Sequence, residues 1–264
     1  MNNNNIKYYW INIDNAIERK NFMKKQFEIR NINNKRISAI TPSNLEDYID
    51  DKPPYNCGYP DCKLNNFKDC PIEYSVLCSH LEAIKEGYKS GDDYFIVCED
   101  DIYFPYDIDF KKMIDNLLED IDIIQMMVIS YNHTEHFYNN YYKNNIHFIK
   151  YTPITPSAGF YLIKRKGAKK ILNKYINNKT NKYNFTNCNF LKLADVLIYQ
   201  SCNTCVSTIP FCIPNINFIS QIHPHHYQDH KKAYDIINKL INENYSSNPF
   251  ILKYYPFESF FNNS

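Results

Sequence analysis

The sequence lacks three features, each of which is typical of one class of protein: membrane proteins, secreted proteins and nucleic-acid-binding proteins. No uninterrupted apolar run approaches the roughly 20 residues of a membrane-spanning helix, so we expect no transmembrane segment. The opening MNNNNIKYYW has no basic region followed by an apolar one, so we expect no signal peptide and a cytoplasmic protein. No long basic run occurs and the formal net charge is +1, which argues against nucleic acid as a partner.

Regularly spaced metal-binding cysteines are also lacking. The chain has nine cysteines, four of which, Cys57, Cys62, Cys70 and Cys78, fall in one segment. Their spacing does not match the paired C-x-x-C pattern of common zinc modules. We therefore expect free thiols, with a zinc site or a disulfide in this segment as the alternative. The abundance of Asn, Lys, Ile and Tyr indicates AT-rich coding, as in an AT-rich microbe or a large DNA virus.

Strand-like and helical segments alternate along the 264 residues, which suffice for one large α/β domain. Strands are expected over 6–13, 35–40, 93–99, 120–129 and 158–163, and helices over 16–29, 71–90, 108–118, 164–176, 190–202 and 227–244. We expect 41–71 to be an irregular insertion with Cys and Pro, 131–145 a polar aromatic loop, and 222–264 a C-terminal helix and tail. The pattern predicts a single Rossmann-like domain over 1–264 with a mainly parallel central sheet.

Three consecutive carboxylates, Glu99, Asp100 and Asp101, follow the strand over 93–99. Ligands of such sheets bind beyond the carboxyl ends of the strands. Strand alternation would put Glu99 and Asp101 on one face and Asp100 on the other. Two carboxylates separated by one residue suit Mg²⁺ or Mn²⁺. The alternative is a solvated turn whose aspartates cap the next helix.

Seven short motifs resemble those of glycosyltransferase family 25 and occur in the same order. They are YYWINIDNAIERKNFM, KRISAI, CSHLEAIKEG, YFIVCEDDI, SAGFYLIKRKGAKKIL, LADVLIY and FISQ, which span about residues 6 to 221. The family includes bacterial lipooligosaccharide galactosyltransferases and collagen hydroxylysine galactosyltransferases. The chain departs from it at Ser75, where members usually have Gly, and in the Cys-rich segment 55–71.

The resemblance implies a GT-A type fold and a particular chemistry. A family member would move a hexose, galactose or glucose, from a UDP-sugar to a hydroxyl of a glycan, lipooligosaccharide or hydroxylysine-type acceptor. The reaction would invert the sugar and depend on a divalent metal, Mn²⁺ or Mg²⁺. Two alternatives are a silent nucleotide-sugar or glycan-binding module of the same fold and a zinc-stabilised interaction protein.

The motifs also assign roles to the acidic residues. Asp101 is expected to hold the metal with support from Glu99, and Asp100 to accept a bond from the ribose or uracil. Asp195, in LADVLIY, is the candidate general base that takes the proton of the acceptor hydroxyl. As the opening residue of a helix, it could equally be an N-terminal acid that stabilises the helix.

Three further positions are expected near the donor, and two histidines near the metal. His80 is a candidate diphosphate contact, and Gly159 would let the backbone approach the donor sugar. Arg19 would contact the nucleotide or pair with a nearby acid. His223 and His225 are candidate third metal ligands, with a surface cluster of histidines as the alternative.

Overall fold

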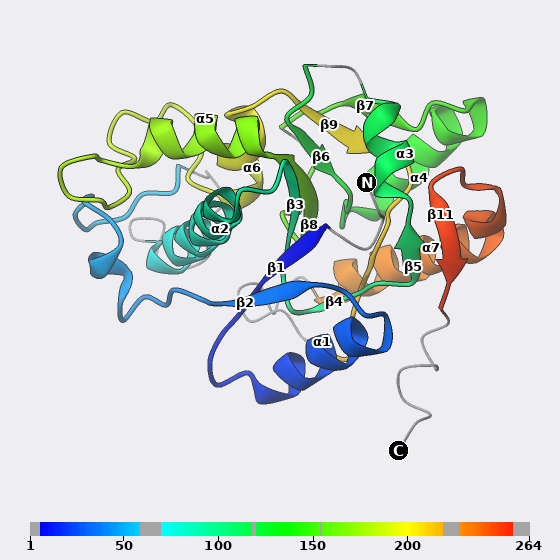
Figure 1. Ribbon diagram of the computed structural model, residues 1–264, viewed down its shortest axis with the longest axis horizontal. Helices are drawn as coiled ribbons and strands as arrows, with labels where there is room; N and C mark the ends of the chain where they lie inside the picture. The colour runs from blue at the N-terminus through cyan, green and yellow to red at the C-terminus, as the bar shows by residue number, and fades with distance from the viewer. Residues whose placement is uncertain (1–5, 59–69, 118–119, 154, 219–226, 256–264) are drawn as a thin grey trace.

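A seven-stranded sheet forms the centre of the computed structural model, which describes residues 6–58, 70–117, 120–153, 155–218 and 227–255 (Figure 1). The strands lie in the order β2 (Asn34–Ser38), β1 (Lys7–Asn12), β3 (Tyr94–Cys98), β8 (Phe160–Lys164), β6 (Ile123–Gln125), β9 (Thr204–Ser207) and β7 (Phe148–Lys150). Strands β8 and β7 run against the other five. The expected α/β fold with a mainly parallel sheet is therefore confirmed.

Hydrophobic residues cover both faces of the sheet, because successive residues of a strand point to opposite sides. Tyr9 and Val97 join one core cluster, whereas Tyr8 and Ile96 join the other. Helices α2 (Pro71–Ser90), α5 (Arg165–Tyr175) and α6 (Ala194–Gln200) pack in the first cluster and lie together in Figure 1. Helices α1 (Ile17–Ile29), α3 (Phe110–Asp115) and α7 (Tyr227–Asn244) contribute to the second. The result is a three-layer arrangement.

Helix α2 has the bounds that its sequence predicts at both ends. Pro71 occupies the first turn, where the missing amide hydrogen is not needed. Gly91 follows the helix with φ of 91°, a left-handed conformation that glycine adopts without strain. Eleven residues of the helix are buried, so one face packs on the sheet and places its first turns beside the carboxyl end of β3.

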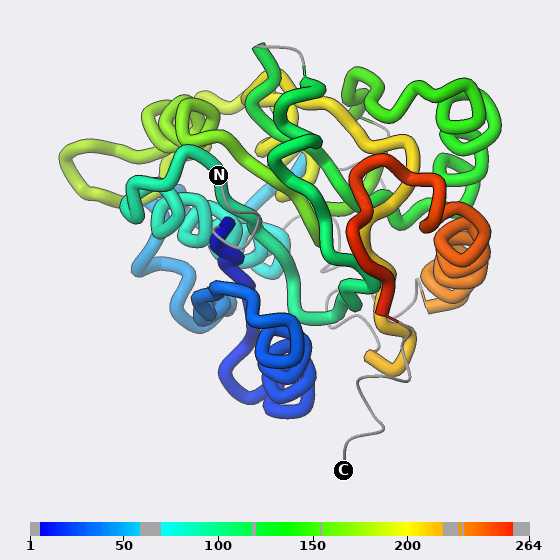
Figure 2. Tube along the Cα trace, turned by 45° about the vertical axis from the view of Figure 1, so that its right-hand side comes forward, coloured from blue at the N-terminus to red at the C-terminus, as the bar shows by residue number. Residues whose placement is uncertain are grey.

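Two small sheets join distant parts of the chain. Strand β4 (Ile102–Tyr103) pairs with β10 (Ile213–Pro214), and β5 (Tyr106–Ile108) pairs with β11 (Ile251–Tyr254). In Figure 2, β11 lies beside α7 near the end of the described chain. None of the helices in the described ranges is long and apolar enough to cross a membrane.

The expectation of a loop over 131–145 is wrong. This segment forms helix α4 (Tyr131–Asn140) and a 3-10 turn (Tyr142–Asn144). Thr134 and Phe137 of α4 are buried, and the helix packs against α7 (Figure 2). Tertiary packing thus overrides the weak helix propensity of its Asn and Tyr residues.

Among the described cysteines, Cys78, Cys98, Cys188, Cys202, Cys205 and Cys212 are free thiols, as expected, and Cys57, Cys70, Cys78 and Cys98 are buried. Cys62 lies outside the described residues, so the alternative of a zinc site in this segment stays open. The insertion over 41–71 is irregular where it is described, apart from a 3-10 turn at Leu45–Asp47.

Candidate functional site

Two adjoining cavities open at the carboxyl ends of β1 and β3, and the acidic triplet lies between them. The smaller, of 270 Å³, is bounded by Asn12, Arg19 and His80 together with all three carboxylates. The larger, of 590 Å³, is lined by Glu99 and Asp101 but not by Asp100. This division is the one that strand alternation predicts.

Asp100 is held by two side chains from the first β-α unit. Its Oδ1 accepts a hydrogen bond from Arg19 at 2.9 Å, and its Oδ2 accepts one from Asn12 at 2.6 Å. Burial raises the pKa of Asp100, while these two donors act against that rise. Arg19 also lies 3.4 Å from Asp101 Oδ2. Arg19 therefore pairs with nearby acids at the wall of the smaller cavity, as one reading of the sequence expected.

Glu99 is oriented by His80 from helix α2. The Nε2 of His80 lies 3.2 Å from Glu99 Oε1, and its Nδ1 lies 3.3 Å from the hydroxyl of Tyr161. Burial raises the pKa of Tyr161, so its hydroxyl keeps its proton and can donate to Nδ1. This leaves Nε2 with a hydrogen to donate to Glu99. Burial opposes the ionisation of Glu99, but the hydrogen bond from His80 and the charge of Arg19 hold its pKa below the ordinary value.

Asp101 is the carboxylate whose charge is least compensated. Its side chain is 25% exposed, its backbone carbonyl accepts a bond from Asn215 at 2.7 Å, and Arg19 is its ion-pair partner at 3.4 Å. Burial and the charge of Glu99 raise the pKa of Asp101 to about 7. A divalent cation between Glu99 and Asp101 would offset this repulsion, and both side chains supply the hard oxygen atoms that Mg²⁺ and Mn²⁺ prefer.

The described part of the chain offers two ligands, Glu99 and Asp101, to such an ion. No group of three or more His, Cys, Asp or Glu side chains in the described ranges is arranged to hold a metal. Mg²⁺ is usually bound by one or two carboxylates with waters and substrate phosphates in the other positions, so the pair fits. His223 and His225 lie outside the described residues and stay predictions.

Asp195 lies in the first turn of α6 and lines the larger cavity with Glu99 and Asp101. Its Oδ2 accepts a hydrogen bond from the backbone amide of Ser157 at 3.0 Å. Burial raises its pKa, and the charges of Glu73 and Glu99 act in the same direction. A carboxylate with a raised pKa that faces a cavity is suited to accept a proton.

Gly159 lies just before β8, opposite the end of β3. Its carbonyl accepts a bond from the Glu99 amide at 3.0 Å, so it fixes where the acidic triplet begins. A β-carbon there would lie 3.0 Å from Met127 Sδ and 3.1 Å from Ser157 Oγ. The missing side chain therefore leaves room for Met127 and Ser157.

The structure adds two charged residues to the larger cavity. Glu73, in the first turn of α2, is only 7% exposed, and His230 lies at the start of α7. The charge of His230 contributes to the lowered pKa of Glu99. The density of histidines over 223–230 is a sequence signal for His230. Glu73 has no such signal, because nothing in the local sequence distinguishes it from other acidic residues in the first turn of a helix.

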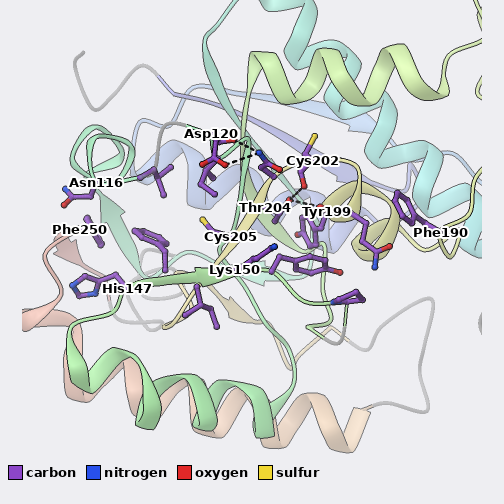
Figure 3. Close-up of a pocket in the computed structure, with 18 of the residues that line it drawn as sticks. Asn116, Asp120, His147, Lys150, Phe190, Tyr199, Cys202, Thr204, Cys205 and Phe250 are labelled. Atoms are coloured by element: carbon purple, nitrogen blue, oxygen red, sulfur yellow. Dashed lines mark hydrogen bonds between the residues drawn. The ribbon is translucent and has the colours of Figure 1, made fainter.

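A third cavity, of 800 Å³, lies at the other end of the sheet (Figure 3). Its labelled residues include Asp120, which precedes β6, Thr204, which begins β9, Lys150, which ends β7, and Tyr199 near the end of α6 (Figure 3). The acidic triplet and Asp195 do not line it. Although it is larger, it lies away from the carboxyl ends of β1 and β3, where ligands of such sheets bind.

One comparison with known proteins, that with family models, agrees with the motifs. A model of glycosyltransferase family 25, described as LPS biosynthesis protein, matches residues 5–188, more than half of the chain. This match confirms the resemblance. Among solved structures, apo mouse xyloside xylosyltransferase 1 is similar at 12% identity and a TM-score of 0.31, over 75% of this chain and 66% of that one. This chain thus spans just under two thirds of that protein's length. The comparison with curated proteins gives no match.

Proposed function

Because the chain belongs to glycosyltransferase family 25, we propose that it transfers galactose or glucose from a UDP-sugar to a hydroxyl group with inversion. The acceptor would be a glycan, a lipooligosaccharide or a hydroxylysine-type residue. The observation that carries the proposal is that Glu99, Asp101 and Asp195 line one cavity at the carboxyl end of the sheet. The cavity thus combines a pair of carboxylates for the diphosphate end of the donor with a base for the acceptor.

The smaller cavity is the place for the nucleotide. Its walls combine apolar side chains, Ile11 and Ile40, with the polar groups of Asn12 and Arg19. Asp100 borders the cavity while Arg19 and Asn12 hold both of its oxygens, so it can accept a ribose or uracil hydrogen only through a remaining lone pair. His80, through its bond to Glu99, orients the carboxylate at the boundary between nucleotide and sugar.

The departing UDP develops negative charge on its phosphate oxygens, and the chain supplies groups that can stabilise this charge. Glu99 and Asp101 would hold Mn²⁺ or Mg²⁺, with a third protein ligand from His223 or His225. The bound ion would neutralise the developing charge as a Lewis acid. Arg19, which is already between Asp100 and Asp101, adds a fixed positive charge on the nucleotide side.

Asp195 is the proposed base for the acceptor hydroxyl. Its Oδ2 accepts a bond from the Ser157 amide, and the Val196 amide also donates to the carboxylate, whose remaining lone pairs can accept a proton. The hydroxyl attacks the anomeric carbon as the bond to UDP breaks, and its proton passes to Asp195. Glu73, Glu99 and Asp101 line the same cavity and would stabilise the positive charge that develops on the sugar ring.

A donor-hydrolysis assay tests the proposal without a known acceptor, because water can take the acceptor's place. UDP-galactose and UDP-glucose are incubated with MnCl₂ or with EDTA, and UDP release is followed. We expect turnover of one donor that EDTA abolishes. The Asp195→Asn variant should lose about 10²- to 10⁴-fold in kcat, the usual contribution of a general base.

Asp101→Asn and Asp14→Asn form a matched pair for the metal role. Asp101→Asn should lose its response to Mn²⁺, whereas Asp14, an exposed residue that pairs with Arg36, should be replaceable without effect. Full metal-dependent turnover in Asp101→Asn would contradict the assigned ligand. UDP binding without hydrolysis of either donor would instead favour a silent binding module.

A further inference from the structure

Gln125 is a fully buried glutamine at the end of β6, and its side-chain amide forms hydrogen bonds with one short segment, residues 155–157. Its Nε2 lies 3.2 Å from the carbonyl oxygen of Thr155, 3.3 Å from that of Pro156 and 3.0 Å from that of Ser157. Three carbonyl acceptors around one atom identify that atom as the NH₂ group rather than the oxygen. One side chain of the central sheet therefore ties three consecutive carbonyls.

Ser157 is held in a conformation that serine rarely adopts. Its φ is 103°, a region that favours glycine, so the residue keeps this conformation only because its surroundings impose it. Its carbonyl accepts a second bond from the Tyr199 hydroxyl at 3.1 Å. Its Oγ accepts one from the amide of Gly159 at 3.0 Å. Bonds from Gln125, Tyr199 and Gly159 thus enforce the strained turn.

The strained turn has one consequence in the reaction cavity. It directs the Ser157 amide at Asp195 Oδ2, 3.0 Å away. Rotation of Ser157 to an ordinary negative φ would turn that amide away, because φ sets the orientation of the N–H relative to the rest of the residue. Asp195 would then lose a hydrogen bond that fixes its rotamer.

We propose that Gln125 is a positioning residue, which holds residues 155–157 so that the Ser157 amide orients Asp195 for proton transfer. The inference rests on the proposed function, since it assumes that Asp195 is the base. Gln125 itself lines neither of the two cavities at the triplet, so it acts through Ser157 and not on a substrate.

The test compares Gln125→Met, which keeps the length of the side chain but removes its hydrogen bonds, with Gln200→Met, a matched change at the end of α6. For donor hydrolysis, Gln125→Met should lower kcat at least tenfold and leave the KM for the UDP-sugar within threefold. Gln200→Met should match the wild type. The thermal midpoint of each variant is measured, and rates are taken well below it, so that partial unfolding does not enter the comparison.

Two further readouts separate positioning from a general structural role. The amide proton of Ser157, observed by ¹⁵N-serine labelling and assigned by its loss in Ser157→Gly, should move upfield in both Gln125→Met and Asp195→Asn. This measurement needs no turnover. Glycine tolerates the positive φ, so Ser157→Gly added to Gln125→Met should restore kcat by at least threefold.

A wild-type kcat in Gln125→Met would overturn the inference, as would a Ser157 amide signal that does not respond to that variant or a double variant no faster than Gln125→Met. Failure of the proposed function looks different. In that case the wild-type protein itself turns over neither UDP-sugar, or Asp195→Asn is as fast as the wild type.

Discussion

At the scale of single residues, several carboxylates lie close together in the reaction cavity. The pH dependence of activity should reflect the repulsion between them. Burial raises the pKa of Asp195, and the charge of Glu73 raises it further. If Asp195 must be ionised to act, activity is lost as the pH falls through this raised pKa. Removing the Glu73 charge lowers that pKa, so the acid limb of the profile should move to lower pH.

The variant Glu73→Gln tests this shift in kcat/KM for donor hydrolysis. Glu135→Gln is the matched control, since Glu135 is exposed on α4 and lines neither cavity at the triplet. Circular dichroism at each pH shows that the fold persists over the range used. An acid limb that stays in place in Glu73→Gln, or that moves equally in Glu135→Gln, would contradict the electrostatic link between Glu73 and Asp195.

At the scale of elements, the contact between α2 and β3 leaves no room for a methyl group at Gly87. Alanine is worth about 1 kcal/mol more than glycine inside a helix, so helix propensity alone predicts that Gly87→Ala stabilises the protein. A β-carbon at Gly87, however, would lie 2.3 Å from Cε2 of the buried Phe95 ring. We expect overpacking to prevail and the variant to lose about 1–3 kcal/mol in the free energy of unfolding.

Urea denaturation of Gly87→Ala measures this loss. The double variant Gly87→Ala with Phe95→Leu has a smaller side chain on the strand, so the added alanine should cost less on a Phe95→Leu background than on the wild type. A gain in stability for Gly87→Ala alone would show that the ring moves away freely and that the packing between α2 and β3 is loose.

Some of the helices and strands could be predicted from local sequence patterns, and others could not. Helix α2 and strands β1, β3 and β8 were predicted because local signals mark them: apolar runs, Pro71 at a helix start and Gly91 past its end. Strands β4 and β10 were missed, since each has two residues and exists only through pairing with a partner about a hundred residues away. Helix α4 was missed because packing on α7 forms it.

In the candidate site, too, some residues could be predicted from local sequence, and others could not. The acidic triplet and Asp195 stand out in short motifs, and the structure brings Glu99, Asp101 and Asp195 to one cavity. Local sequence could not indicate that Asn12 bonds to Asp100, 88 residues away, or that Gln125 ties Ser157. Such contacts arise from the order of strands in the sheet, which places β1 beside β3 and β6 beside β8.

At the scale of the whole molecule, Arg30 joins three distant parts of the chain. It follows α1, and its side chain is 2% exposed. The guanidinium donates to the carbonyls of Phe104 and Tyr106 and to Asp107 on β5. Its guanidinium lies 5.2 Å from the ring centre of Tyr255, whose hydroxyl donates to Asp107 at 2.7 Å. The first helix, the middle of the chain and the end of the described chain thus meet at one cation.

Replacing Arg30 with Met should therefore lower the free energy of unfolding by about 3 kcal/mol, because it removes a buried partner from a carboxylate and two carbonyls together. Chemical denaturation measures the loss. Arg165→Met is the control: Arg165 donates to the carbonyl of Tyr88 and forms no ion pair within the described ranges, so its loss should be near 1 kcal/mol. Arg30 lines neither cavity at the triplet, so kcat for donor hydrolysis should stay near that of the wild type while the protein is folded. Equal losses in the two variants would mean that Arg30 contributes no more than Arg165 and does not join the three segments.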